Sequence, residues 1–442
     1  GGRRRLSRRS RSAACSPCSA LLCAASFCTM PPKKTEVNVG DTNVAKFGRA
    51  GNTLRMGILG LPNVGKSSLF NLLTEQSIPA ENYPFCTIDP NEARCALPDA
   101  RYEHLTSIWK PANSYPAYLQ VVDIAGLVRG ASEGKGLGND FLSHIQRVDG
   151  LFHVVRAFED PDITHVDDTV DPVRDLETIQ MELCLKDLQY VKRAIEDEER
   201  DVKKSRGMKL SALFIETLAR VQGMLESNQP IRDGVWSTTE VDMIRNKCPQ
   251  LITTKPIIYL VNMSAADFAN KKNKWLPKIH AWVKEHGGGS MIPLSVDWEA
   301  NYFKAKDDKD AQAAFVDAHA GATSVLPKVV QTGYSNLDLV HYFTAGEKEV
   351  RCWTLQRGQC APAAAGLIHS DFERGFIKAE VVAYADFKSL NTGSKGLSEA
   401  KAAGKFRIEG RRHHPLPVQR DRTREEEVRS FQWWSCSSGI IV

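Results

Sequence analysis

Short apolar runs alternate along the chain with segments that have the periodicity of amphipathic helices. Residues 67–74, after the first apolar run, carry apolar positions at the spacing of one helix face. Strands that alternate with helices predict an α/β fold with a parallel sheet covered by helices on both faces. Five runs have the length and composition of buried strands: 55–61, 118–123, 151–155, 256–262 and 291–295.

A long charged segment interrupts this alternation between the third and fourth strands. Its apolar residues, within about 175–228, recur at helical spacing among many Glu, Lys and Arg. Gly207 divides the segment, so the pattern predicts two helices packed as an antiparallel pair. The charged run from Glu196 to Lys204 is interpreted as a solvated face, with a partner-binding arm as the alternative.

The character of the sequence changes after about residue 330. Short strand-like runs at 350–355 and 377–383 surround turn-rich stretches and predict a small α+β module over 336–420. From 411 onward the chain has no recognisable helix or strand period. The His pair and the charged run in 411–442 are therefore interpreted as a solvated tail.

The segment 1–53 lies outside the fold prediction. Its first part, 1–34, holds six Arg, two Lys and no acid, and so contributes +8 to a net charge of +5. The rest of the chain carries −3, and charge alone does not predict nucleic-acid binding by the body of the protein. Residues 1–29 are interpreted as upstream sequence ahead of an initiator at Met30, with an organellar transit peptide as the alternative.

Neither a membrane span nor a disulfide framework is predicted. No apolar run approaches the roughly 20 residues that cross a bilayer. Four of the 11 Cys lie in the first 30 residues and the others lack paired spacing, which predicts no zinc site and a reducing compartment. We expect a monomer in the cytoplasm, with the nucleus as a further location and no membrane partner.

A glycine-rich loop directly follows the first strand. It reads G-L-P-N-V-G-K-S over 60–67 and matches G-x-x-x-x-G-K-[ST] between a predicted strand and a predicted helix. Backbone N–H groups of such a loop surround phosphate oxygens. Lys66 is expected to reach the β- and γ-phosphates and to serve catalysis, and the Ser67 hydroxyl to bind Mg²⁺. The predicted nucleotide contacts in and after the loop are Asn63, Val64, Gly65, Lys66, Ser67 and Ser68.

Two further motifs fit the phosphate end of a nucleotide hydrolase. Thr87 follows Ser67 by 20 residues, where a loop threonine can complete the Mg²⁺ shell and sense the γ-phosphate. Asp123 ends the second strand and precedes Gly126 in Asp-Ile-Ala-Gly. The carboxylate is expected to hold a Mg²⁺-bound water, and the Gly126 N–H to meet the γ-phosphate.

The fourth strand ends on Asn262, where an amide that reads the base belongs. Guanine-specific proteins of this kind carry Asn-Lys-x-Asp there, but the position of the acid is Ala265 in this chain. A buried guanine N–H without a partner costs about 1–3 kcal/mol, enough to erase a preference for guanine. Asn262 and the backbone near Met263 are expected to pair with adenine. Ser295 lies at the end of the fifth strand and is also expected to contact the nucleotide, because ligands bind beyond the carboxyl ends of such strands.

These motifs closely resemble the Obg-like ATPases, the YchF branch of the Obg GTPases. The resemblance lies in the nucleotide half at 60–67, 82–91, 122–128, 136–139, 156–159 and 163–166. It continues at 342–346, 350–354 and 368–377, which resemble the family's C-terminal TGS domain. It implies a GTPase-type P-loop domain over 54–315 with a helical-hairpin insert and a β-grasp-like TGS domain.

The resemblance also implies site roles and one difference. Many GTPases place a water-orienting Gln after Asp-x-x-Gly, where this chain has Leu127. The family suggests His153 in that role, with a core His as the alternative, and K⁺ near Asn63 as a second cation besides Mg²⁺. Family members usually carry an acid at the position of Ala265 and continue after Gly410 into a closing strand, which this sequence does not predict.

The sequence therefore predicts a molecular switch that hydrolyses ATP slowly and binds GTP more weakly. Its alternative is a nucleotide-gated module, docked on ribosomes or proteins, in which hydrolysis is incidental. The likeness to TGS domains suggests contact with RNA or the ribosome by analogy alone.

Overall fold

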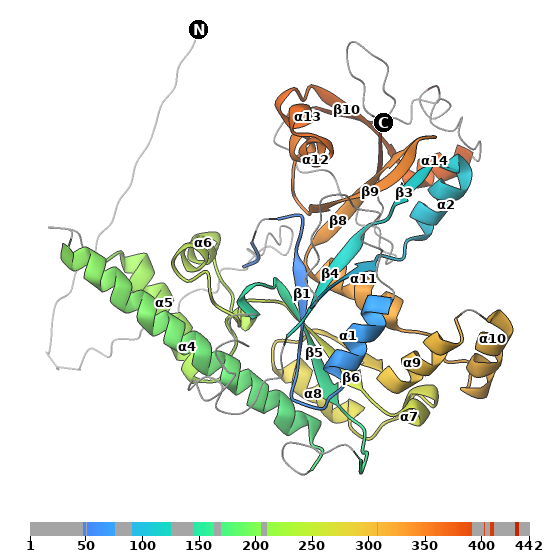
Figure 1. Cartoon of the computed structure of the whole chain (residues 1–442). Helices are drawn as coiled ribbons and strands as arrows, with labels where there is room; N and C mark the ends of the chain where they lie inside the picture. Colours follow the sequence, from blue (N-terminus) through green and yellow to red (C-terminus); the bar gives the residue numbers. More distant parts are fainter. Residues whose placement is uncertain are drawn as a thin grey trace, which may run out of the picture. The chain divides into compact units, whose positions relative to one another are not determined.

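The computed structural model describes residues 47–49, 51–75, 91–124, 145–162, 169–204, 210–306, 308–390, 402, 407–410 and 429–432. Its first sheet has six strands in the order β2-β4-β1-β5-β6-β7 (Figure 1). The strands are β1 (Arg55–Leu59), β2 (Glu92–Ala96), β4 (Tyr118–Asp123), β5 (Gly150–Arg156), β6 (Ile257–Asn262) and β7 (Ser290–Leu294).

The five predicted strands and their parallel pairing are confirmed, and a sixth strand, β2, was not predicted. All neighbouring strands run parallel except β2, which pairs antiparallel with β4. The β2 sequence, E-A-R-C-A, lacks the continuous apolar character of strands buried on both faces. An edge strand of this kind gives a weak sequence signal.

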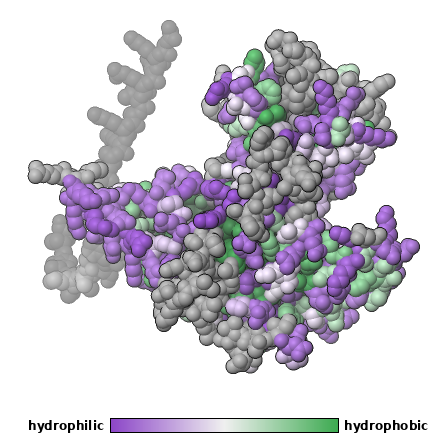
Figure 2. Space-filling model, viewed as in Figure 1, coloured by the Kyte–Doolittle hydropathy of each residue, from purple (hydrophilic) through white to green (hydrophobic). Residues whose placement is uncertain are grey.

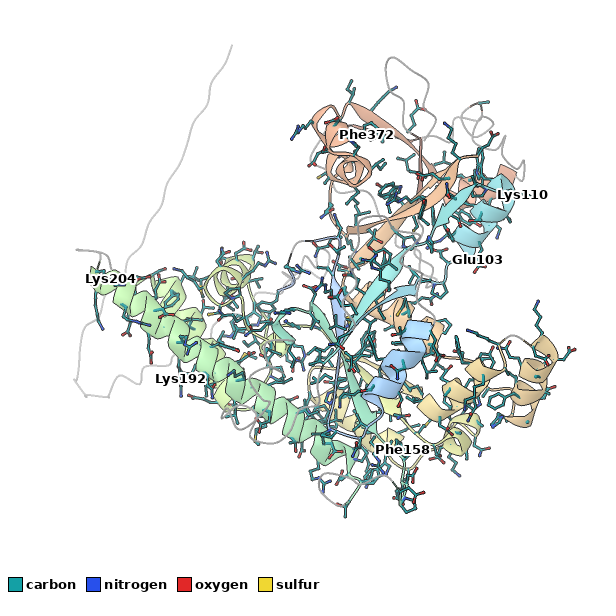
Figure 3. The ribbon with its side chains drawn as sticks, viewed as in Figure 1. Glu103, Lys110, Phe158, Lys192, Lys204 and Phe372 are labelled. Carbon is teal, nitrogen blue, oxygen red and sulfur yellow. The ribbon has the colours of Figure 1, made fainter. Side chains whose placement is uncertain are left out.

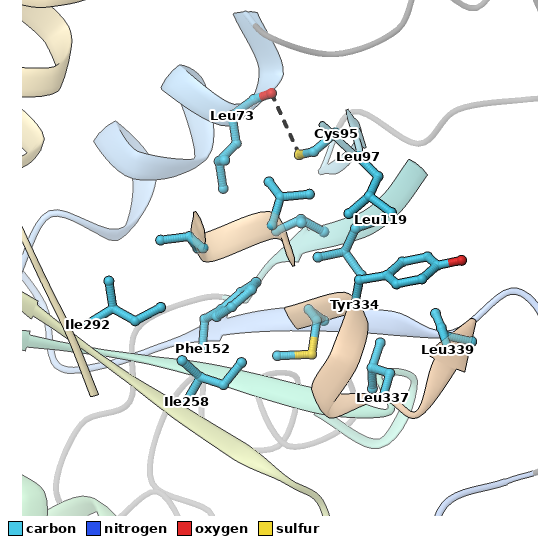
Figure 4. Packing of buried hydrophobic residues seen from close by; sticks show 14 of the residues in the cluster. Leu73, Cys95, Leu97, Leu119, Phe152, Ile258, Ile292, Tyr334, Leu337 and Leu339 are labelled. Carbon is cyan, nitrogen blue, oxygen red and sulfur yellow. Dashed lines mark hydrogen bonds between the residues drawn. The ribbon is translucent and has the colours of Figure 1, made fainter. Parts of the chain in front are cut away.

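Helices cover the two faces of this sheet. On one face, α1 (Lys66–Glu75) packs on β1, β2 and β4 and contacts α9 (Val296–Lys304), while α11 (Leu326–Asn336) packs on β4 and β5. A Cβ on Gly333 of α11 would lie 2.6 Å from the Phe152 ring, and Figure 4 shows this apolar layer with Phe152 at its centre. Because successive strand residues point to opposite faces, His153 points to the other face, where α4 (Pro172–Lys204) contacts α8 (Leu276–Glu285).

The predicted helical insert is confirmed. It consists of α4 and α5 (Ala212–Glu226), which pack together and are here called the helical arm (Figure 1). The arm shares a separate apolar cluster, which includes Val191 and Leu218, with α6 (Thr238–Lys247). Lys192 and Lys204 project from α4 (Figure 3), and the outer surface of the arm is mainly hydrophilic (Figure 2).

A buried carboxylate anchors the arm to the first sheet. Asp187 of α4 is fully buried and accepts hydrogen bonds from Ile252 N at 2.9 Å and from Thr253 N and Oγ1 at 2.7 Å. Burial raises the pKa of this carboxyl to about 6. These bonds satisfy the backbone just before β6, so the arm is joined to the sheet by buried polar contacts as well as by apolar packing.

The second sheet has the order β11-β10-β12-β8-β9-β3. The predicted runs at 350–355 and 377–383 lie in β9 and β10. Strands β3, β11 and β12 lie outside every predicted run. The pairing of β3 with β9 joins residues more than 200 positions apart in sequence, and β12 pairs with both β10 and β8. The backbone of β12 therefore lies in the tail after 411, where the sequence shows no recognisable strand period. The strands are β3 (Asn113–Tyr115), β8 (Leu339–Ala345), β9 (Glu349–Gln356), β10 (Lys378–Ala383), β11 (Arg407–Gly410) and β12 (Arg429–Gln432).

A buried hydrogen bond connects the segment after β2 to the second sheet. Asp99, the N-cap of α2 (Ala100–Trp109), lies 2.7 Å from His341 Nε2 of β8 and also binds Arg101. The remaining helices are η3 (Ile231–Asp233), α7 (Ala265–Ala269), α10 (Lys309–Ala318), α12 (Ala361–Ile368), α13 (Ser370–Arg374) and α14 (Tyr384–Leu390). Within the part of the chain that is described, no helix combines the length and apolar character needed to cross a bilayer.

Candidate nucleotide-binding site

The glycine-rich loop turns tightly between β1 and α1. A Cβ on Gly60 would lie 2.6 Å from the Val154 carbonyl oxygen, and one on Gly65 would lie 2.6 Å from Asn262 Nδ2. Gly65 also has a φ of +100°, which L side chains rarely adopt. Both glycines are thus required by close approach, and the loop has the compact path expected of a phosphate-binding loop.

Lys66 begins α1 directly after this loop. Its side chain is buried, and Nζ donates to the Leu61 carbonyl oxygen at 2.6 Å. Burial lowers the pKa of this ammonium to about 8, although the nearby Asp123 charge acts in the opposite direction. A buried cation at the start of a helix is a strong electrostatic partner for phosphate, because little water screens it.

Ser67 and Asp123 are close together beside Lys66. Ser67 Oγ donates to Asp123 Oδ2 at 3.3 Å. Asp123 Oδ1 is buried and has no hydrogen-bond partner among the described residues. Burial raises the pKa of this carboxyl above its ordinary value, against the lowering effects of the Ser67 hydrogen bond and the Lys66 charge. A hydroxyl and a carboxylate with an open oxygen form the hard oxygen donor set that fits Mg²⁺.

Asn262 connects the phosphate loop to the opposite side of the pocket. Its Nδ2 donates to the Val64 carbonyl oxygen at 3.0 Å, and its Oδ1 accepts from the Val296 N–H at 3.1 Å. The side chain is almost completely buried. One amide hydrogen and one lone pair remain, because a primary amide has two of each. Asn262 therefore positions the loop and can still meet a base.

The other predicted base contacts, Met263 and Ser295, make hydrogen bonds within the protein. Met263 is buried and its N–H donates to the Leu294 carbonyl oxygen, so this N–H is not available to adenine. Ser295 is fully buried as the N-cap of α9, and its hydroxyl accepts from the Trp298 N–H at 3.3 Å. Ala265 is half-buried at the start of α7. The roles predicted for Met263 and Ser295 stay predictions, since contact with a base would involve other atoms than these.

His153 does not lie with the phosphate-binding residues. It is a buried residue within β5, and its ring packs against Tyr259 with centroids 5.8 Å apart. It borders a cavity of about 10 Å³ lined also by Leu176 and Ile179 of α4. Burial, together with the charges of Arg232 and Lys66, lowers the pKa of His153 to about 3. A neutral imidazole enclosed by side chains is consistent with the alternative of a core histidine, and the water-orienting role stays a prediction.

The other predicted loop positions differ in their setting. Asn63 and Ser68 are exposed, and Val64 is buried. Asn63 has a φ of 60°, in the left-handed region that Asn tolerates. Thr87, Gly126 and Leu127 lie outside the described residues, so their predicted roles stay predictions.

One feature near the base side was not predicted as part of the site. Arg156 ends β5 directly beside Asn262 in the sheet. Its guanidinium lies 4.6 Å from the centre of the Phe158 ring and donates to the Phe158 carbonyl oxygen at 3.2 Å. Phe158 lies beyond the carboxyl end of β5 (Figure 3). The sequence signal was available, because an Arg and an aromatic residue follow a strand at the ligand-binding edge.

Comparisons with known proteins agree with this arrangement. A family model described as "50S ribosome-binding GTPase" matches residues 55–187, and the YchF-GTPase_C model, described as "Protein of unknown function (DUF933)", matches 339–415. Obg-like ATPase 1 of Oryza sativa subsp. indica is 50% identical over 382 residues, which cover 86% of this chain and 94% of the relative. Obg-like ATPase 1 of Homo sapiens is 45% identical over 387 residues, with 87% and 95% covered.

A solved structure extends the comparison to the fold. The Schizosaccharomyces pombe YchF GTPase superposes with a TM-score of 0.75 at 41% identity, covering 88% of this chain and all of that one. The P-loop fold predicted from the sequence is thereby confirmed. The chain belongs to the YchF family of P-loop nucleotide hydrolases, the Obg-like ATPases.

Proposed function

We propose that this protein binds ATP with Mg²⁺, prefers it to GTP, and hydrolyses it to ADP and phosphate as a molecular switch. The observation that carries the proposal is the Ser67–Asp123 pair beside the buried Lys66 ammonium at the end of the phosphate loop. A phosphate-binding loop, a cationic side chain and oxygen ligands for Mg²⁺ are the parts that phosphoryl-transfer sites require.

Each of these residues has a defined task in the proposal. Lys66 exchanges its bond to the Leu61 carbonyl for the β- and γ-phosphates, and its charge stabilises negative charge as the terminal bond breaks. Ser67 and Asp123 would hold Mg²⁺, directly or through water. The ion would neutralise phosphate charge and orient the terminal phosphate. The Gly126 N–H remains our candidate for contact with the γ-phosphate.

The preference for ATP is proposed from the base side of the pocket. Ala265 offers no carboxylate to the N1–H and 2-amino groups of guanine, so a guanine bound there would leave donors unpaired. Phe158, with the Arg156 guanidinium against its ring, offers an aromatic face just beyond the end of β5, where Arg156 pairs with Asn262. The relatives are named ATPases, which supports the same assignment.

Slow turnover is proposed as well. Leu127 has no polar atom to orient water, and we assign no catalytic role to His153. Exposed Asn63 is the candidate for a K⁺ contact. We further propose that the second sheet is a TGS-type module and that the protein contacts the ribosome or RNA. The contact with the ribosome is supported by the "50S ribosome-binding GTPase" description of the family model that matches residues 55–187. A monomer acting in the cytoplasm or nucleus fits these proposals.

Isothermal titration with ATP and GTP tests the proposed nucleotide preference. The variant Ala265→Asp restores the acid that guanine requires, and we expect the ATP/GTP affinity ratio to fall by one or two factors of ten, about 1.4 kcal/mol each. Ala266→Asp is the matched control, since it adds the same charge at the exposed neighbouring position. An unchanged ratio in Ala265→Asp contradicts the proposed base pocket. Single-turnover hydrolysis with and without ribosomes separates the switch from a module in which hydrolysis is incidental.

A further inference from the structure

Asp297 lies in the first turn of α9, one residue after the Val296 N–H that bonds the Asn262 side chain. It is the second residue of α9 and is exposed. Its neighbour Val296 donates its N–H to the Asn262 side chain, so the N-terminus of α9 is held against the residue that connects to the phosphate loop. One turn further on, Asn301 Nδ2 donates to Asp297 Oδ1 at 3.3 Å. The carboxylate therefore has a restrained position near Asn262.

The strand register relates Asp297 to the position of the missing acid. Asn262 of β6 pairs with Leu294 of β7 in a parallel register. Ala265 and Asp297 each lie three residues beyond these paired positions, at the starts of α7 and α9, and the two helices contact each other. The start of α7 thus has no acid at Ala265, whereas the start of the neighbouring α9 carries one at the equivalent position, Asp297.

We propose that Asp297 is a specificity-determining residue that favours adenine through the substituent at position 6 of the purine. An ionised carboxylate only accepts hydrogen bonds. Adenine presents an amino donor at position 6, whereas guanine presents an oxygen acceptor there. Asp297 therefore attracts the adenine amino group and repels the guanine oxygen. The inference rests on the proposed function, since it requires that the base lies against Asn262.

A purely structural role for Asp297 makes a different prediction. An acid in the first turn stabilises a helix through the helix dipole, which affects folding and not the choice of base. The cap of α9 is made by Ser295, whose hydroxyl accepts from the Trp298 N–H. Replacing Asp297 leaves this cap in place, so the variants are expected to fold.

The test compares ATP, GTP and inosine triphosphate by isothermal titration. Inosine triphosphate carries the oxygen at position 6 but lacks the 2-amino group, so the ATP/ITP ratio isolates position 6. We expect Asp297→Asn and Asp297→Ala to lower the ATP/ITP and ATP/GTP affinity ratios by about tenfold, because an amide can face either substituent and Ala faces neither. Asp310→Asn is the matched control, since Asp310 is the exposed second residue of α10, and its ratios should equal those of the parent.

The outcomes separate this inference from the function on which it rests. If the parent protein prefers ATP and the Asp297 variants keep the affinity ratios of the parent, the inference is overturned and the proposed function stands. An equal gain in affinity for all three nucleotides also overturns it, because removal of a charge near the triphosphate explains that result. A parent protein that binds none of the three overturns the proposed function and the inference together.

Discussion

Replacement of His153 distinguishes a core residue from a catalytic one. The ring is enclosed between the sheet and α4, where Leu176 and Tyr259 line the same small cavity. The pKa of His153 is lowered to about 3, so the imidazole is neutral at every pH at which the enzyme would be assayed. We therefore expect that His153→Ala reduces stability and leaves catalysis by the folded protein nearly unchanged.

The magnitude follows from the burial of the side chain. Truncation of a buried Leu, Ile or Met to Ala costs about 2–5 kcal/mol, and of Phe about 3–5 kcal/mol. An imidazole ring is intermediate in size, so His153→Ala should cost about 2–4 kcal/mol. His153→Leu nearly conserves the volume and should cost less than about 1.5 kcal/mol. Because 1 kcal/mol shifts the Tm of a large domain by about 2–4 °C, the Ala variant should melt roughly 5–15 °C lower.

The assay pairs thermal melting with single-turnover hydrolysis well below the Tm. Both variants should keep kcat within about twofold of the parent, because neither change touches the phosphate-binding residues. The pH–rate profile should also show no limb that disappears in His153→Leu. A Leu variant that melts like the parent but loses tenfold or more in kcat refutes the reasoning and returns His153 to the catalytic role predicted from the sequence.

Two further predictions concern titratable groups. The pKa of Lys66 is about 8 before nucleotide binds, and phosphate favours the charged form, so ATP affinity should be full below about pH 7 and fall roughly tenfold by pH 9. The variant Lys66→Met, titrated with ATP at the same pH values, should bind ATP weakly and without this pH dependence. Equal pH dependence of ATP affinity in the parent and in Lys66→Met would contradict the assignment. The raised pKa of Asp187, about 6, contributes stability that is full below the ordinary carboxyl pKa and is lost as pH rises through 6. Urea unfolding should therefore show that the parent exceeds Asp187→Asn in free energy of unfolding by about 1 kcal/mol more at pH 5 than at pH 7. A difference that grows as pH rises would show that the pKa of Asp187 is not raised in the folded protein.

Sequence reasoning succeeded for elements whose signal is local. The central strands β1, β5 and β6 are buried on both faces and read as largely continuous apolar runs. The short edge strands β2 and β3 were missed because their stability comes from pairing with distant partners and not from their own composition. For β3, the partner of Asn113 is Glu349. No periodicity within the three residues N-S-Y can indicate such a contact.

The same distinction applies to the site. Lys66 and Ser67 lie near Asp123, because the loop follows β1 and Asp123 ends the neighbouring strand β4. Their roles stay predictions. The enclosed setting of His153 could not be predicted, because residue chemistry and nearness in sequence do not specify which face of a strand is enclosed. That face is decided by Leu176 and Ile179, which reach β5 from the helical arm and belong to a separate part of the sequence.

The geometry of Asn262 explains why base selection falls to residues at the rim. Each end of its amide makes one bond to the protein backbone, at Val64 and at Val296, which leaves one donor and one acceptor for a ligand. Adenine and guanine share the acceptor N7, so this amide can serve either purine equally well. Its buried bonds keep the phosphate loop and the start of α9 in fixed relation whatever the base. Discrimination must therefore come from groups that meet the positions where the purines differ. Ala265 and Asp297, at the starts of α7 and α9, are the residues that we propose for this role.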